Sequence, residues 1–329
     1  MTNDRDRGSV LFYVVWVIVL LSIFAASIAS QTLFALDLSE RLSEQLRAAY
    51  IARGGVALAA LVLAHDPTSG FDPLNDPWAD AGGGFFERQL AGGTVTITGD
   101  ELPDGTRRYG LVDEDRRINL NAAPHEVLAH LLQDVGGMSE EDAASSAAAI
   151  EDWRDEDDDE RPGGAEGIYY RSRDHGYDCQ NGPFENIEEL LLVKGITPSI
   201  YQRVAPAVTV YGSGRLNLNT ATPTALRGLG LSSDGVAGFM AFRAGDDGKE
   251  QTADDRRLAS ITTLADDLNG YVGLEEINRL NAIARKGALG IASEAFRVSV
   301  QAQTSKPMSR MAVDCVIDRH GRVQQWAER

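Results

Sequence analysis

Residues 9–36 read SVLFYVVWVIVLLSIFAASIASQTLFAL and contain no charged side chain. At about 1.5 Å per residue, a helix over this stretch is longer than the roughly 30 Å hydrocarbon core of a bilayer. A secretory signal has a shorter apolar region with a small-residue cleavage site behind it, whereas here a short polar segment, Met1–Gly8, stands in front. A cut after Gly8 would leave the apolar helix on the mature chain, with Ser9 as its first residue. We therefore predict a helix that anchors the chain in a membrane by a single pass.

The helix is expected to continue beyond the apolar stretch. Leu38, Leu42, Leu46 and Ala49 follow one another at helical spacing, with charged residues on the other faces. The pattern ends before Asp66-Pro67. The sequence thus predicts one helix over residues 9–64, apolar all round at first and one-sided later, where a domain can pack against it.

Short strands are predicted on both sides of a central helical segment. Residues 94–99 (TVTITG) alternate, and residues 108–113 are expected to pair with them in a hairpin across Pro103-Asp104-Gly105. Near the end of the chain, residues 295–302 and 311–319 alternate as well, with a turn at residues 320–322 into a last short strand. These strands can complete the sheet that begins at Thr94. The predicted class is α+β: a leader (1–8), a long helix (9–64), a β region (65–115), an inserted helical domain (116–290) and closing strands (291–329).

The central segment carries an internal repeat. Residues 117–121 (RINLN) return as residues 215–219 (RLNLN), each followed by an Ala- and Pro-containing helix start. Further on, residues 149–154 parallel 239–243, and residues 184–190 parallel 258–264. The insertion is therefore predicted to hold two related helical units, the second more degenerate, of a SAM-like or helix-hairpin-helix-like kind.

One stretch of the first unit raises the possibility of DNA binding. Residues 190–197 (LLLVKGIT) have the helix-Gly-helix pattern of helix-hairpin-helix modules, in which glycine permits the tight turn. DNA-binding versions hold phosphates with backbone N–H groups and nearby bases, but Lys194 is the only base here and several glutamates flank it. The whole chain has 49 acidic against 31 basic residues, a net charge of −18, which repels nucleic acid. A hairpin that only packs two helices is the favoured interpretation, and no nucleic-acid partner is expected.

A dense acidic run follows the first unit's Asp152-Trp153-Arg154 motif. Asp155, Asp157, Asp158 and Asp159 lie within five residues, and Glu166 follows a Gly163-Gly164 turn that could fold it back onto them. Calcium takes six to eight oxygen ligands, and the spacing is not that of an EF-hand loop. From the residues alone, a solvated acidic loop and a cation site both remain open. A second acidic loop stands at the equivalent place in the second unit, with residues Asp246, Asp247, Asp254 and Asp255.

Other chemistry has little support in the sequence. Two cysteines, Cys179 and Cys315, are too few for a cysteine-ligated zinc site, and whether they pair is left open. The five histidines stand in no H-E-x-x-H or comparable motif, and neither a G-x-S-x-G nor a phosphate-binding loop occurs. The sequence predicts that the protein is not an enzyme.

The whole order of segments resembles the large minor pseudopilin, the K subunit, of type II secretion systems. Its most specific pieces are DWRDED at 152–157, GAEGIYY at 164–170, NGPF at 181–184 and ELLLVKGI at 189–196, together with Asn217–Ala221. Most members of the pilin class carry a glutamate five residues into the mature chain, whereas this K-type subunit lacks it, and Tyr13 stands there in this sequence. That glutamate neutralises a neighbour's amino terminus inside the membrane, and a subunit with no neighbour above it needs none.

The resemblance implies a function, a cofactor and partners. The chain would be a non-enzymatic subunit at the tip of the pseudopilus that initiates assembly for protein export across the outer membrane. A prepilin peptidase would cut between Gly8 and Ser9, and the mature chain would sit in the inner membrane with its bulk in the periplasm. Expected partners are the I-type and J-type minor pseudopilins, the major pseudopilin and membrane lipid.

The resemblance also implies calcium in the insertion, with a ligand set drawn from Asp155, Asp157, Asp158, Asp159 and Glu166. The family's Asp after Gly-Ala-Glu is Gly167 here, so one ligand would be missing or replaced. Two other hypotheses stay open at this point. One is a minor pilin of a type IV pilus or competence system, and the other is a membrane-tethered helix-hairpin-helix protein that binds DNA.

Overall fold

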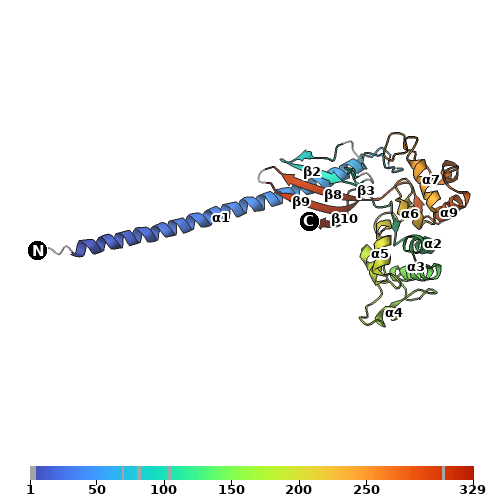
Figure 1. The fold of residues 1–329 in the computed structure, drawn as a ribbon, viewed down its shortest axis with the longest axis horizontal. Coiled ribbons are helices and arrows are strands. Elements are labelled where there is room, and N and C mark those ends of the chain that lie inside the picture. Colours follow the sequence, from blue (N-terminus) through green and yellow to red (C-terminus); the bar gives the residue numbers. More distant parts are fainter. Residues whose placement is uncertain (1–4, 69, 80–82, 102–104, 306–307) are drawn as a thin grey trace.

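A computed structural model describes the chain except for residues 1–4, 69, 80–82, 102–104 and 306–307. Helix α1 (Arg5–Ala64) projects far from a head that holds a sheet and a cluster of short helices (Figure 1). Its first part is exposed and apolar, while Ile51, Ala52, Val56, Ala59 and Leu63 are buried at helical spacing. The helix therefore follows the predicted pattern, and the structure begins it at Arg5, within the expected leader.

The buried half of α1 packs against an antiparallel sheet. Its strands are β1 (Arg88–Leu90), β2 (Gly93–Thr98), β3 (Val112–Asp113), β8 (Ala295–Thr304), β9 (Arg310–Asp318) and β10 (Val323–Glu328). The order is β1-β2-β8-β9-β10, with β3 also paired to β8. Gly55 allows the close approach of the helix, because a Cβ there would come within 2.6 Å of Val95 and 2.8 Å of Val300. The closing strands thus complete the sheet that begins near Thr94, as predicted.

The predicted hairpin between residues 94–99 and 108–113 is only partly correct. Gly99 N–H donates to Arg108 O at 2.9 Å and Arg108 N–H to Asp100 O at 3.0 Å, so the two segments do meet. However, β2 pairs along its length with β8 and β1, and Val112 and Asp113 pair with β8 instead of β2. Strand β8 pairs with β2 over the whole length of β2, which the short segment 108–113 cannot do. The alternation of residues in β2 does not show which distant strand will be its partner. The tip of the predicted turn, Pro103 and Asp104, lies outside the described residues.

The segment between β3 and β8 forms the inserted helical domain. Its first unit contains β4 (Ile118–Asn119), α2 (His125–His130), a π-helical turn (Leu131–Val135), α3 (Glu140–Arg154), α4 (Gly167–Arg171), a 3-10 helix (Ile187–Leu192), α5 (Pro198–Val204), a second 3-10 turn (Ala205–Ala207) and β5 (Val208–Thr209). The second contains β6 (Leu216–Asn217), α6 (Pro223–Gly228), α7 (Ser233–Arg243), a 3-10 turn (Ile261–Thr263), α8 (Leu264–Asp267), α9 (Leu274–Arg285) and β7 (Leu289–Gly290). The described buried side chains of both units form one hydrophobic cluster, separate from the cluster between α1 and the sheet. The predicted α+β class with an inserted helical domain is confirmed.

The internal repeat is visible in the hydrogen bonds. In the first unit, Asn121 donates to Phe184 O at 3.0 Å and accepts from Phe184 N–H at 2.8 Å. In the second, Asn219 donates to Leu258 O at 3.0 Å and accepts from Leu258 N–H at 2.8 Å. A short parallel strand pair opens and closes each unit, β4 with β5 and β6 with β7. The paired asparagines are therefore clamps that hold a distant segment against the start of each unit.

Candidate metal centre

Three carboxylates from the predicted set meet in the loop after α3. Asp155, Asp157 and Glu166 each offer an oxygen, and these oxygens lie within 4.8 Å of one another. Glu166 is only 3% exposed, Asp155 is half-buried and Asp157 is exposed. The site is thus open on one side and closed by Glu166 on the other.

Buried oxygens at this site lack partners in the protein. Both carboxylate oxygens of Glu166, Oδ1 of Asp155 and Oδ1 of Asn181 are buried without a hydrogen bond. Burial, reinforced by the negative charges of Asp152 and Asp155, raises the pKa of Glu166 to about 7. A buried oxygen without a partner costs about 1–3 kcal/mol, and a cation would satisfy several at once. Carboxylate and amide oxygens are hard ligands, so the residues present fit calcium.

The loop is held in this shape by polar contacts to its backbone. The buried carboxylate of Asp152 accepts from Ala165 N–H at 2.8 Å and from the Arg161 side chain at 2.8 Å. Lys194 Nζ donates to Gly163 O at 3.1 Å and Gly164 O at 2.8 Å. These contacts bring Glu166 back onto the acidic run, as the Gly163-Gly164 turn predicted.

Lys194 therefore has an intramolecular role. Its amine caps the loop that carries Glu166 and lies 5.2 Å from the Tyr169 ring centre, so phosphate binding would require breaking these contacts. Gly195 has φ +86°, which confirms that glycine makes the turn between the two helical segments. The hairpin packs the first unit, and its one base supports the acidic loop that carries Glu166.

Asp158 and Asp159 do not join the cluster. Asn181, which the sequence did not single out as a ligand, donates to Asp158 Oδ1 at 2.9 Å and to Asp157 O at 3.2 Å. Asp159 is exposed, and its N–H donates to Asp157 Oδ1 at 2.9 Å. Asn181 itself has φ +44°, and its Oδ1 is buried without a hydrogen-bond partner. Its place in the NGPF piece at 181–184 is the sequence-level sign that could have pointed to it.

The acidic loop of the second unit is arranged differently. Asp254 accepts from the backbone N–H groups of Asp246 and Asp247 at 2.8 and 3.0 Å. Asp255 accepts from those of Gln251 and Thr252 at 2.6 and 3.0 Å. Because backbone donors already satisfy these carboxylates, the described part of this loop presents no comparable open oxygen set.

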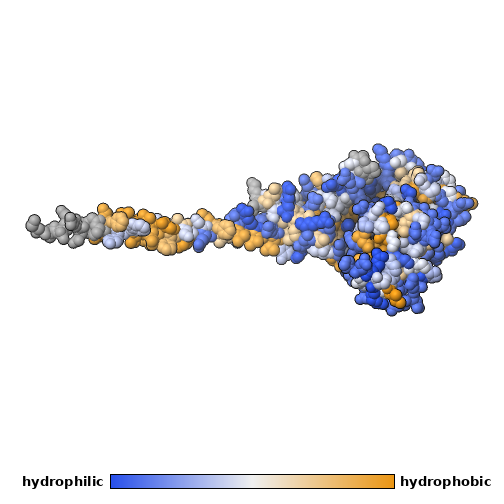
Figure 2. Space-filling model, turned by 60° about the horizontal axis from the view of Figure 1, so that its bottom comes forward, coloured by the Kyte–Doolittle hydropathy of each residue, from blue (hydrophilic) through white to orange (hydrophobic). Residues whose placement is uncertain are grey.

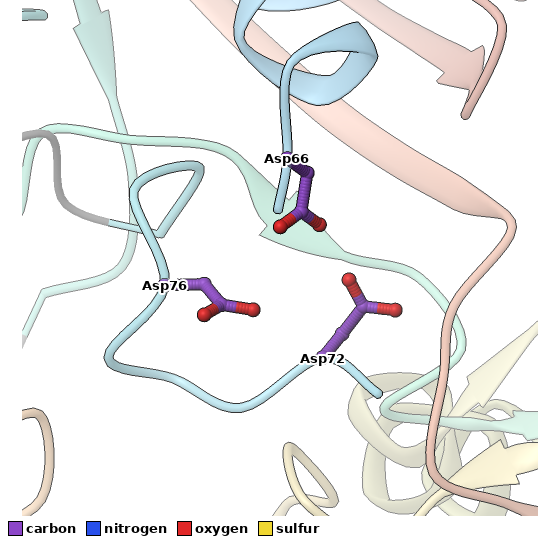
Figure 3. A group of neighbouring side chains, drawn as sticks. All are labelled: Asp66, Asp72 and Asp76. Atoms are coloured by element: carbon purple, nitrogen blue, oxygen red, sulfur yellow. The ribbon is translucent and has the colours of Figure 1, made fainter. Parts of the chain in front are cut away.

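A second acidic group, Asp66, Asp72 and Asp76, was not anticipated from the sequence. Figure 3 shows these side chains turned toward one another in the loop after α1, with oxygens within 4.8 Å. Arg319 pairs with Asp66 at 3.1 Å and with Asp72, and Thr68 donates to Asp66 and Asp76 at 2.8 and 2.9 Å. This group is an ion-pair network that fastens the end of α1 to the sheet. Its basic partner lies about 250 residues away in the chain, so no local pattern marks it.

The cysteines are both free. Cys179 is half-buried near Asp152, and Cys315 is buried in β9. Burial raises the pKa of the Cys179 thiol to about 11 and of the Cys315 thiol to about 12. Both thiols therefore stay protonated and unreactive near neutral pH.

Comparison with known proteins gives matches that agree with one another. The family model described as "Type II secretion system (T2SS), protein K" matches residues 109–213. The type II secretion system protein K of Klebsiella pneumoniae is 26% identical over 235 residues, 67% of each chain. That of Pectobacterium carotovorum subsp. carotovorum is 26% identical over 68% of each chain, and a putative one from Escherichia coli K12 is 28% identical over 66%.

A solved structure shares the fold. It is the GspK-GspI-GspJ complex of the enterotoxigenic Escherichia coli type 2 secretion system, one chain of which matches with a TM-score of 0.61. The match covers 88% of this chain and 96% of that one at 18% identity. The family model falls on the first unit, where the most specific sequence pieces lie, and the fold match covers most of the chain. The chain is thus similar to type II secretion system protein K in the sequence of its first unit and in its fold.

Proposed function

We propose that this chain is a minor pseudopilin that occupies the tip of a type II secretion pseudopilus. The observation that carries the proposal is the combination of an exposed apolar helix with a bulky insertion at its far end. The segment Val10–Ala64 includes an 18-residue window of mean hydropathy 2.6 that is not buried within the molecule. Figure 2 shows this surface as a largely orange stalk that extends to the left from a mostly hydrophilic head.

The apolar helix suits two successive environments. It is long enough to cross the inner membrane, and its uncharged surface can later pack against sibling helices in the pseudopilus. The head would then lie in the periplasm. Tyr13 leaves no carboxylate to neutralise a neighbour's amino terminus in the apolar core, which suits a subunit that lies above all others.

The insertion supports the tip position by its bulk. It extends from the end of the sheet that lies farthest from the amino terminus (Figure 1). A further subunit stacked above would collide with it. The solved complex of the structural neighbour contains GspI and GspJ, so we expect the I-type and J-type minor pseudopilins to bind this chain.

Calcium binding in the insertion is part of the proposal. Asp155, Asp157 and Glu166 would hold the ion. Asn181, whose side-chain amide contacts Asp157 O and Asp158 Oδ1, has a buried Oδ1 without a partner and is a candidate for a further ligand. The ion would neutralise buried acid charge and tie the loop to α3, which is a structural role. DNA binding is disfavoured because Lys194 is committed to the loop backbone.

The test begins with the mature amino terminus. Full-length protein produced with a prepilin peptidase should lose Met1–Gly8, and protein produced without it should keep them, as read by intact mass. The tagged mature chain should then retain I-type and J-type pseudopilins from detergent extracts. The major pseudopilin should be retained only when these two subunits are present. Cleavage without pseudopilin binding would favour a pilus or competence system, and an uncut terminus would contradict the whole proposal.

A further inference from the structure

The insertion meets the sheet at one crowded junction. The chain leaves the sheet through residues 113–115, the second unit begins at residues 217–220, and the chain returns through residues 291–295. The loop after α1 joins them, because Asp72 N–H donates to Ile291 O at 2.8 Å. Buried carboxylates from two of these segments lie together here.

Asp113 is the centre of the junction. It is 1% exposed, and its Oδ2 accepts from Ser293 Oγ at 2.6 Å, from Asn217 Nδ2 at 3.2 Å and from Thr220 Oγ1. Its Oδ1 accepts from Asp115 N–H at 2.8 Å. The side chain therefore links the outgoing strand, the second unit and the returning segment through neutral donors.

Asp72 accepts hydrogen bonds from two of the same residues, Ser293 and Asn217. Its Oδ2 accepts from Ser293 N–H at 2.7 Å, and its backbone oxygen accepts from Asn217 Nδ2 at 3.0 Å. Asp115, on the other side, accepts from Glu294 N–H at 2.7 Å and Ser213 Oγ at 2.9 Å. Three carboxyl groups thus hold the returning segment 293–295 in place.

Negative charge predominates around Asp113, since the neighbouring buried Glu114 already pairs with Arg117 and Arg297. Asp113 faces Asp115 from its own segment and Asp72 from the loop, while Arg319, beyond Asp72, pairs with Asp72 and Asp66. The second unit and the returning segment present neutral groups to it, namely Asn217, Thr220 and Ser293. Neighbouring buried carboxyl groups resist full ionisation, and a shared proton is the usual outcome.

We propose that this junction is a proton-binding latch, which holds the insertion on the sheet more firmly as the surroundings become more acidic. Burial first, and then the charge of Asp115, raises the pKa of Asp113 to about 7. Burial raises the pKa of Asp72 to about 6 in spite of Arg319, and it raises the pKa of Asp115 as well. A protonated Asp113 still accepts hydrogen bonds and can donate one to the Ser293 or Thr220 hydroxyl, so the latch stays closed without the repulsion.

The direction of the effect follows from these shifts. The folded junction binds a proton more tightly than the open one, whose carboxyls have ordinary pKa values near 3.8. The resulting stabilisation is complete below that value and is lost as the pH rises through about 6 to 7. Between the open-state pKa and the folded-state pKa, each proton released on opening makes the opening equilibrium constant rise by about tenfold per pH unit.

Hydrogen–deuterium exchange of the full-length chain in detergent tests the latch. Opening constants of segments 112–119 and 290–296, corrected for the intrinsic pH dependence of exchange, should rise steeply from pH 5 to pH 7.5. Asp113→Asn, which has no proton to release, should reduce the slope by about one proton. Asp266→Asn, an exposed carboxyl on α8, should keep the wild-type slope.

All samples contain a chelator, so that no calcium is bound at the loop around Glu166. A change of calcium binding with pH then cannot alter the measured opening constants. Opening constants that do not change with pH in the wild-type chain would overturn the proposal, as would a slope in Asp113→Asn equal to that of wild type. If Asp113→Asn fails to fold, the wild-type series and Asp72→Asn decide the matter. Neither outcome affects the cleavage and partner tests of the proposed function.

Discussion

Arg154 and Arg243 make the same contact in the two units of the insertion. Arg154 donates to the carbonyl oxygens of Leu120 and Ala123, and Arg243 donates to those of Leu218 and Ala221. In each unit the arginine ends a helix and caps the turn that follows the repeated Asn-Leu-Asn motif. The two units therefore share this arginine cap, whereas the acidic loops that follow the two arginines differ in structure.

Replacing Arg243 should be the more damaging of the two changes. Arg243 is 4% exposed and also pairs with Glu250, at 2.8 Å from its Nε, so Arg243→Leu leaves a carboxylate and two carbonyls unpaired. We expect a loss of about 3–5 kcal/mol in the free energy of unfolding, and a smaller loss for the less buried Arg154→Leu. Urea unfolding followed by circular dichroism measures both. Arg215→Leu, on an exposed side chain, is the control, and equal effects of all three changes would contradict the capping role.

Gly195 should not tolerate a side chain. Its φ is +86°, and a Cβ would overlap Ser146 Oγ on α3. Gly287 has a similar φ of +79°, but nothing lies within 4 Å of its Cβ position. We therefore expect Gly287→Ala to cost about 1 kcal/mol and Gly195→Ala about 1–3 kcal/mol more, as measured by urea unfolding. Equal losses would mean that the hairpin turn does not depend on close packing against α3.

Calcium should stabilise the chain through Glu166. At a calcium concentration 100 times the dissociation constant, the gain is about 2.7 kcal/mol, seen as a rise in Tm that a chelator reverses. Glu166→Gln should abolish most of this rise, because it removes the buried carboxylate. Asp159→Asn and Asp254→Asn should leave it intact, since Asp159 lies outside the cluster and Asp254 belongs to the self-bonded second loop. Loss of the response in Asp159→Asn but not in Glu166→Gln would contradict the ligand set that the structure assembles.

Calcium binding should also release protons at mildly acidic pH. The pKa of Glu166 is raised to about 7 without an ion, whereas a metal ligand must be ionised. Its protonation stabilises the calcium-free fold below a pH of about 4.5, and this contribution is lost as the pH rises through about 7. Calcium affinity should therefore increase from pH 6 to pH 8 and then level off. Calorimetry in two buffers of different ionisation enthalpy measures the released proton, and release that Glu166→Gln fails to reduce would contradict this assignment.

Much of the fold and part of the site could be predicted from local patterns. The apolar run at residues 9–36, the helical spacing after it and the repeated Asn-Leu-Asn motif predicted the long helix and the paired units. The glycine pair at 163–164 and the acidic run predicted where Glu166 would turn back. All of these depend on residues near one another in the chain.

What the sequence by itself determined is therefore the set of elements, because periodicity, turns and charge density act over short distances. Only the tertiary structure decided which strands pair, since β2 has to choose between neighbours separated by about 200 residues. It also decided which acids are open for a metal and which are closed by backbone donors or by Arg319. The junction around Asp113 is also a product of the tertiary structure, because its burial and the closeness of like charges arise only when distant segments pack together.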